Sequence, residues 1–421
     1  MRILWVSASA IGPASRILEQ KYGGSSGVWI QTIYEELKEK NDNAEMFFLC
    51  FSKNVKKNTV IHKKNAEGEA FCLNMPRVSL GRNAPEHLKK NIERIIDDIK
   101  PDIIHIWGTE TCVQNVVADC AENIPKIVFI QGIIGVHDRY HNSDLKKQGL
   151  IYKKSFFEKA RGFVYDYLFH KQVKFEAQEI KNCGNVIIDN KFTAAYCKSI
   201  DENIRFYNYH LNPSKVFEEN IWSFDGCVKN SIFTIYGSSQ DKGLHQLLRA
   251  VSIVKKSVPD VKVIIPGAFH IDPATNRLSK TGLSSYEKFL LKLIKEGSIE
   301  ENVVFCGQLT QKEMAEHIKE SNIFVNPSVM EVHAGSLREA MLVGIPSIST
   351  YCGSVGEYLL EGKNGLLYRY EEFEVLAFKI LELFNNSELC SALGENARKT
   401  IINSKCSSEN TLFDIYNCIA K

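Results

Sequence analysis

Residues 324–346 read FVNPSVMEVHAGSLREAMLVGIP, and this stretch carries the most information about fold and function. An apolar strand ends at Asn326-Pro327, and a helix is expected from about Ser336 to Gly344, where a C-terminal glycine stops it. Glu331 stands in the loop before the helix, and Glu339, eight positions later, is expected in the first helical turn. This spacing predicts that both carboxylates face one pocket at the start of the helix.

The chemistry of such a pocket suits a sugar nucleotide. Free amides and the dipole at a helix N-terminus attract phosphate, and carboxylates accept hydrogen bonds from sugar hydroxyls. The spacing alone has a second interpretation, because Ser336-x-x-Glu339 also matches a capping box. Glu339 would then bond to the backbone at Ser336, and Glu331 would be an exposed loop acid.

The composition is that of a soluble globular protein. The 421 residues are 44% hydrophobic and 24% charged, with a formal net charge of +2. These values exclude a disordered or fibrous chain, predict two or three domains, and give no support for nucleic-acid binding. The twelve cysteines are scattered without a C-x2-C pair, which favours buried thiols over a disulfide framework or zinc site. No long apolar run or secretory leader is found, so a cytoplasmic location is expected.

Short apolar strands alternate with helices along the whole chain. In the first half, strands are expected near 3–6, 46–51, 103–106, 126–130 and 185–188; in the second half they are expected near 231–236, 261–265, 303–305, 323–325 and 346–349. Such alternation predicts an α/β protein with a parallel, doubly wound sheet in each half. Leu211-Asn212-Pro213 and the polar stretch to about Asn230 are the best linker candidate. Ligands bind beyond the carboxyl ends of such strands, so a cleft between the two domains is expected.

The wider string around the two glutamates resembles a known family. Pro-Ser-x-x-Glu, seven residues, Glu-Ala-Met and then Gly-x-Pro is similar to the segment that retaining glycosyltransferases of family 4 (glycosyl transferases group 1) carry in their second domain. Further matches follow in the family's order over most of the chain: Gly23-Gly24, Pro101–Ile106, Asp241–Leu244, Val303–Gly307, Gly353–Glu357 and Gly362–Leu367. The resemblance implies a GT-B fold of two Rossmann-like doubly wound domains facing an interdomain cleft.

This resemblance also implies domain boundaries. An N-terminal acceptor-side domain would span residues 1–212, and a sugar-nucleotide-binding domain would span 213–404. A terminal helix within 405–421 would cross back to the first domain.

The same resemblance implies roles for the matching residues. Glu339 would bind the nucleotide ribose, Glu331 would bind the transferred sugar, and Lys242 would hold the diphosphate and stabilise the leaving group. Further donor-side positions are the backbone of Gly335, Ser336 and Leu337, the Gly23-Gly24 turn, Gly307 at the end of the base-binding strand, and Ser238. Ser238 stands where the family usually has an arginine. Gln131 stands where many members have a catalytic histidine, and His105 and His137 are alternatives for that role or are simply packed or solvated histidines.

The implied reaction is sugar transfer, with retention of configuration, from a UDP- or GDP-sugar to a glycan or lipid-linked acceptor in surface polysaccharide or glycolipid assembly. No cofactor is expected. No metal is expected either, because no two aspartates stand two positions apart as in the Asp-x-Asp pair of metal-dependent transferases. Two other interpretations are a catalytically silent GT-B subunit that binds a partner transferase and a nucleotide-sugar epimerase.

Residues 146–176 mix lysines and arginine with aromatic residues. Such a stretch predicts either peripheral contact with the inner face of the membrane or a buried helix with a solvated charged face.

Overall fold

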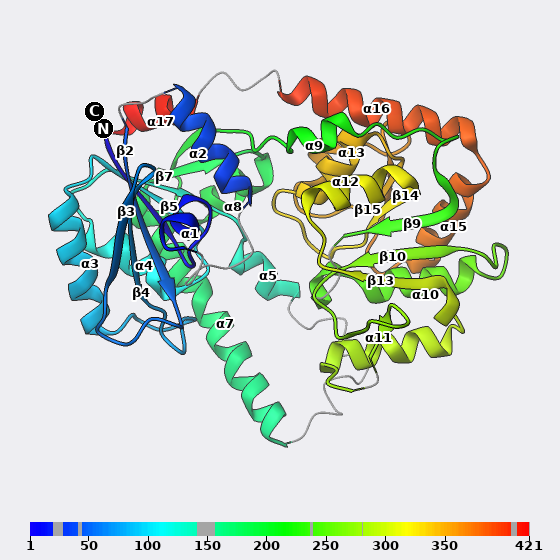
Figure 1. Ribbon diagram of the computed structural model, residues 1–421, viewed down its shortest axis with the longest axis horizontal. Helices are drawn as coiled ribbons and strands as arrows, with labels where there is room; N and C mark the ends of the chain where they lie inside the picture. The colour runs from blue at the N-terminus through cyan, green and yellow to red at the C-terminus, as the bar shows by residue number, and fades with distance from the viewer. Residues whose placement is uncertain are drawn as a thin grey trace. The chain divides into compact units, whose positions relative to one another are not determined.

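The computed structural model describes residues 1–19, 28–40, 44–140, 156–235, 239–279, 281–405 and 411–420. They form two compact units (Figure 1). The first unit comprises Met1–Arg139, Phe156–Leu211 and Ser408–Lys421, and the second comprises Tyr140–Ser155 and Asn212–Ser407. Each unit is an α/β domain with its own hydrophobic core.

The first unit is built on an eight-stranded sheet in the order β3-β4-β2-β1-β5-β6-β7-β8. Its strands are β1 (Arg2–Ser7), β2 (Glu45–Ser52), β3 (Ile61–Asn65), β4 (Gly68–Asn74), β5 (Ile103–Trp107), β6 (Lys126–Phe129), β7 (Asn185–Ile188) and β8 (Arg205–Asn208). Its helices are α1 (Pro13–Ile17), α2 (Val28–Lys40), α3 (Glu86–Ile99), α4 (Cys112–Cys120), α5 (Ile134–Tyr140), α7 (Phe156–Cys183), α8 (Lys191–Ile200) and α17 (Leu412–Ile419).

The expectation of a purely parallel first sheet is wrong at one edge. β3 runs antiparallel to β4, whereas the other neighbouring strands of this sheet are parallel. Only Ala66 and Glu67 join the two strands, and so short a connection permits a hairpin but no crossover. Gly68 completes the turn at φ 144°, where a Cβ would lie 2.3 Å from the carbonyl oxygen of Met46.

The second unit is built on a six-stranded sheet in the order β13-β10-β9-β14-β15-β16, with all neighbours parallel. Its strands are β9 (Val228–Thr234), β10 (Lys262–Pro266), β13 (Val303–Gly307), β14 (Ser321–Asn326), β15 (Ser347–Thr350) and β16 (Leu366–Tyr368), with a separate hairpin of β11 (Ile271–Asp272) and β12 (Arg277–Leu278). Its α-helices are α9 (Lys215–Glu219), α10 (Leu244–Val254), α11 (Ser285–Glu296), α12 (Gln311–Glu320), α13 (Gly335–Val343), α14 (Val355–Tyr358), α15 (Phe373–Phe384) and α16 (Ser387–Lys405). Two short 3-10 helices are η2 (Gln240–Lys242) and η3 (Glu300–Asn302).

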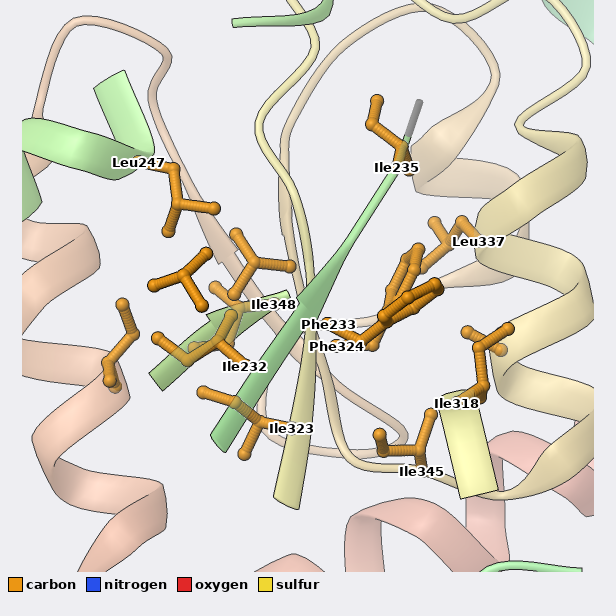
Figure 2. Close-up of a cluster of buried hydrophobic side chains, with 14 of the residues drawn as sticks. Ile232, Phe233, Ile235, Leu247, Ile318, Ile323, Phe324, Leu337, Ile345 and Ile348 are labelled. Atoms are coloured by element: carbon orange, nitrogen blue, oxygen red, sulfur yellow. The ribbon is translucent and has the colours of Figure 1, made fainter. Parts of the chain in front are cut away.

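The central strands of the second unit are buried on both faces. Phe233 of β9 pairs in register with Phe324 of β14. Figure 2 shows both rings on the side of the sheet that carries Leu337 of α13, while Ile232 and Ile323 point to the opposite side. Successive side chains of a strand alternate between faces, so helices must cover both. This confirms the doubly wound arrangement.

Strand order locates the switch point of each sheet. In the second unit the chain builds outward from β9 through β10 to β13, then returns to the other side of β9 with β14. In the first unit it builds outward from β1 through β2, then returns with β5. Connections on the two sides leave in opposite directions, which opens a crevice at the carboxyl ends of these strand pairs. Ligands are therefore expected to bind at these two crevices.

The expected linker is partly a packed element. The stretch after Pro213 forms α9, and the side chains of Phe217 and Trp222 are buried in the second unit's core. The indole Nε1 of Trp222 donates to the carbonyl of Ser321 at 2.8 Å. These two aromatic residues explain why a stretch interrupted by proline and charges packs against the core rather than spanning freely between domains.

The C-terminal helix α17 packs in the core of the first unit. The Tyr416 hydroxyl is fully buried, accepts a hydrogen bond from Trp5 Nε1 at 2.9 Å and lies 2.5 Å from His105 Nδ1. His105 is therefore a packed core histidine, and the alternative of a catalytic role for it is wrong.

Among the described residues, none of the helices is both long and apolar enough to cross a bilayer.

Candidate active site

Lys242 and Glu331 meet at the switch point of the second unit. Lys242 ends η2, after β9, and Glu331 lies in the loop after β14. The Lys242 Nζ donates to Glu331 Oε1 at 2.8 Å, and the buried Ser328 hydroxyl donates to the same oxygen at 2.5 Å. The side chains of Lys242 and Glu331 are 33% and 13% exposed, so a ligand can reach both.

Two glycines hold the loops of this pair together. Gly243 has φ 68°, and a Cβ there would lie 1.9 Å from the carbonyl oxygen of Pro327. The amide of Val329 donates to the carbonyl of Asp241 at 2.9 Å and joins the same two loops. Because only glycine combines this φ with so close an approach, the Lys242 turn is fixed against the Glu331 loop.

The loop after β15 supports Glu331 from its other side. Gly353 has φ 49°, and a Cβ there would lie 1.9 Å from the carbonyl oxygen of Glu331. That oxygen accepts a hydrogen bond from the amide of Ser354 at 3.0 Å. The hydroxyl of Thr350 donates to the carbonyl of Ser328, which fixes the start of the same loop.

The charges of this pair are coupled. Partial burial opposes the charge of Lys242, but the nearby Glu331 carboxylate outweighs it and raises the pKa of Lys242 above its usual value. The ammonium group therefore stays protonated at neutral pH. An anionic ligand would find a cation whose present partner is a single side-chain carboxylate.

Helix α13 begins without a side-chain cap. Its N-cap is Ala334, held in the left-handed region at φ 46°, and no side chain there accepts a hydrogen bond from the helix. The capping-box interpretation of Ser336 and Glu339 is therefore wrong. The helix begins at Gly335, which is exposed, and a Cβ there would meet open space. Its first-turn amides, those of Gly335, Ser336 and Leu337, lack helical acceptors and can face a ligand.

Glu339 is the fifth residue of α13, so it lies in the second turn rather than in the first as expected. Burial raises the pKa of its carboxyl to about 7, and the neighbouring Arg338 opposes this only in part. Among the described residues, no hydrogen-bond donor satisfies this carboxylate. Leu337 packs its side chain in the core at 1% exposure and can contribute only its amide to a site.

The remaining expected residues lie in other parts of the two units. Gly307 ends β13 with φ 74°. Gln131 is half-buried in the loop between β6 and α5 of the first unit. His137 lies on α5 of the same unit. Gly23, Gly24 and Ser238 lie outside the described residues.

Sequence reasoning missed the supports of the pair. Ser328 and Gly353 both lie within the sequence motifs described above, but the sequence pattern does not show that they contact Glu331. It also missed Glu110, which follows β5 in the first unit. The available signal for it was an acid two positions after a glycine, in the loop that follows a buried strand.

The comparisons with known proteins agree with this geometry. The family model described as glycosyl transferases group 1 matches residues 227–400, which include Lys242, Glu331 and Glu339. Residues 227–400 form a group 1 glycosyltransferase domain. CapM of Staphylococcus aureus, a capsular polysaccharide biosynthesis glycosyltransferase, is 24% identical over 63% of this chain and 68% of its own length. The chain spans less of other curated relatives, such as 42% of the putative glycosyltransferase EpsD of Bacillus subtilis at 25% identity.

Solved structures show the fold. Sucrose-phosphate synthase of Thermosynechococcus elongatus superposes with a TM-score of 0.69 over 100% of this chain and 96% of that chain, at 15% identity. HepE of Anabaena, solved in complex with UDP, gives a TM-score of 0.63 over 96% of this chain and 95% of that chain, at 15% identity. The chain therefore has the GT-B fold, with a Rossmann-like domain in each unit.

Proposed function

We propose that this protein is a retaining glycosyltransferase that moves a sugar from a nucleotide diphosphate sugar to a glycan or lipid-linked acceptor. One observation carries the proposal: the Lys242–Glu331 pair stands at the switch point of the second unit. A cation, a carboxylate and the uncapped amides of α13 are the groups that a sugar diphosphate needs.

Each group has a distinct role in the proposed donor complex. Lys242 and the first-turn amides of α13 hold the diphosphate and stabilise the charge that grows on the leaving group. Glu331, released from Lys242 when the phosphates take the ammonium group, accepts hydrogen bonds from the transferred sugar. Glu339 accepts hydrogen bonds from the ribose hydroxyls. Gln131, in the first unit, contacts the reacting sugar. That the two units face each other across a cleft stays a prediction.

The relatives support this assignment of substrate class. CapM is named for capsular polysaccharide biosynthesis, and the HepE structure contains UDP. By analogy, we propose a UDP- or GDP-sugar as donor and a surface polysaccharide or glycolipid precursor as acceptor. A cytoplasmic location stays a prediction.

We further propose that the reaction needs no divalent metal, because Lys242 and the α13 amides neutralise the diphosphate. Full activity in EDTA is expected. Activity lost in EDTA and restored by Mn²⁺ or Mg²⁺ would show that the diphosphate site has been misassigned.

Thermal shift against UDP-, GDP- and ADP-sugars tests the proposal. A bound sugar nucleotide at 100 times its dissociation constant should stabilise the protein by about 2.7 kcal/mol. The shift should be reduced in Lys242→Ala and kept in Lys312→Ala, an exposed lysine on α12. No shift with any donor would contradict the proposal. A shift without donor hydrolysis or transfer would instead favour the silent-subunit interpretation.

A separate observation supports contact with an anionic membrane surface. Helix α7 extends from the sheet of the first unit (Figure 1), and Phe163 and Tyr167 on it are 75% and 57% exposed. Arg161 and Lys174 are exposed on the same helix. Exposed aromatic residues beside cations are typical of helices that lie on anionic lipid. The part of the predicted stretch before residue 156 lies outside the described residues.

Sedimentation with phosphatidylglycerol vesicles tests this contact. Binding should fall in the double variant Phe163→Ser, Tyr167→Ser and persist in Phe378→Ser, which removes an aromatic ring 69% exposed on α15. Equal binding to phosphatidylcholine vesicles, or no effect of the double variant, would contradict the contact.

A further inference from the structure

The first unit has a carboxyl group at its own switch point. Glu110 lies in the loop between β5 and α4, and β5 pairs with β1 where the sheet changes direction. The amide of Gly132, in the next loop, donates to Glu110 Oε1 at 3.2 Å, and the Gln114 Nε2 donates to Oε2 at 3.3 Å. Glu110 therefore joins the loop after β5 to the loop that carries Gln131.

The backbone makes room for this carboxyl group. Gly108 has φ 92°, and a Cβ there would lie 2.1 Å from Glu110 Oε2. Gly108 is itself anchored, because its amide donates to the carbonyl of Phe129 at 2.8 Å. A side chain at this position would displace the carboxyl group from the crevice, so glycine keeps it there.

Glu110 keeps unused hydrogen-bonding capacity. A carboxylate has about four acceptor positions, and the bonds from Gly132 and Gln114 are both longer than the usual 2.9–3.0 Å. Among the described residues, no lysine, arginine or histidine forms an ion pair with Glu110. Glu110 is only half-buried, so a ligand can reach part of the residue.

The neighbouring acids differ from Glu110 in this respect. Glu176 of α7 accepts hydrogen bonds from the amides of Ile134 and Gly135 at 2.8 and 2.9 Å, from the hydroxyl of Thr109 at 3.0 Å and from Tyr196. It therefore caps α5. Glu179 of α7 is 1% exposed and bonds to Asn115. Both are structural. Burial raises the pKa of Glu110 to about 7, and the nearby Glu176 carboxylate adds to the rise.

We propose that Glu110 determines acceptor specificity by accepting a hydrogen bond from a neutral hydroxyl of the acceptor sugar. This inference rests on the proposed transferase function, since it assigns the acceptor side of the same reaction. The ionised Glu110 carboxylate disfavours a phosphate or carboxylate at this position of the acceptor. The ligand class is a neutral glycoside, with the Gln131 amide in the adjoining loop as a second polar contact.

Saturation-transfer difference NMR on the full chain tests the proposal with methyl hexopyranosides and the matching hexose 6-phosphates as probes. The wild type should bind at least one neutral glycoside more tightly than its phosphate. At pH 8, where a pKa of about 7 leaves Glu110 mostly ionised, Glu110→Ala should weaken glycoside binding about tenfold or more, because a hydrogen bond to a charged acceptor is lost. Glu122→Gln, which changes an exposed acid in the loop between α4 and β6, is the control.

Glu110→Gln keeps the size of the side chain and removes its charge. It therefore tests the ligand preference, which would not change if Glu110 had only a structural role. Removing the charge should raise the affinity for the hexose 6-phosphate relative to the glycoside. Unchanged glycoside binding in Glu110→Ala, an unchanged preference in Glu110→Gln, or a wild type that binds no neutral glycoside would each overturn the proposal. Failure of the transferase function would appear separately, as the absence of any thermal shift with sugar nucleotides.

Discussion

We predict that the carboxyl of Glu339 makes donor binding depend on pH. Burial raises its pKa to about 7, so near neutral pH the ligand-free protein holds a mixture of the neutral acid and the carboxylate. In the proposed donor complex, ribose hydroxyls donate hydrogen bonds to the ionised form. Donor binding must therefore remove the proton wherever it is present, and affinity should increase as pH rises through 7.

The size of the effect follows from the ionised fraction. With a pKa of about 7, roughly one molecule in eleven is ionised at pH 6, half at pH 7 and about ten in eleven at pH 8. The dissociation constant should thus fall about tenfold between pH 6 and pH 8. An exposed glutamate would already be ionised at pH 6 and would produce almost no change.

Isothermal titration calorimetry with the sugar nucleotide found by thermal shift measures this dependence. A nucleotide sugar is preferred to UDP, because its diphosphate carries no proton that titrates in this range. Glu339→Gln should bind more weakly and lose the pH dependence. Glu316→Gln, an exposed acid on α12, should keep it. The reasoning is refuted if wild-type affinity is flat from pH 6 to pH 8, or if Glu339→Gln retains the slope.

Three further changes test neighbouring parts of the structure. Lys242→Ala should weaken binding of the nucleotide sugar far more than binding of the nucleoside in calorimetry, because only the former carries the diphosphate; equal losses would remove Lys242 from the phosphate site. Glu331→Ala should lower turnover more than nucleotide binding in steady-state kinetics, and an unchanged turnover would contradict its contact with the sugar. Tyr416→Phe should lower the free energy of unfolding by about 1–3 kcal/mol in urea titration, since the indole of Trp5 loses its buried partner; an unchanged stability would show that the hydroxyl is dispensable.

Local pattern in the chain was enough to predict the architecture. Runs such as Ile3–Val6 are apolar on successive residues, which is typical of strands buried on both faces, and the helices between them impose parallel crossovers. The exception is β3, which lies at an edge of the sheet. The two-residue turn between β3 and β4 makes this pair antiparallel, although strands elsewhere alternate with helices and are parallel. The two glutamates and Lys242 were predicted as site residues because each stands in a contiguous motif that resembles the family's, and their residue types suit phosphate and hydroxyl chemistry. Their roles stay a prediction.

Tertiary structure alone decided which of these groups meet. Lys242 and Glu331 are 89 positions apart, and they form an ion pair because β9 and β14 are adjacent in the sheet although β10 and β13 come between them in the chain. Strand order depends on which helices can bury both faces of the sheet at once. The hydrophobic periodicity of the sequence does not show that order. The same holds for Glu110 and Gly132, joined across two loops, and for Ala334, whose left-handed backbone leaves α13 uncapped although Ser336 and Glu339 have the spacing of a cap. Spacing shows which bonds a segment is able to form, whereas packing determines which of them are formed.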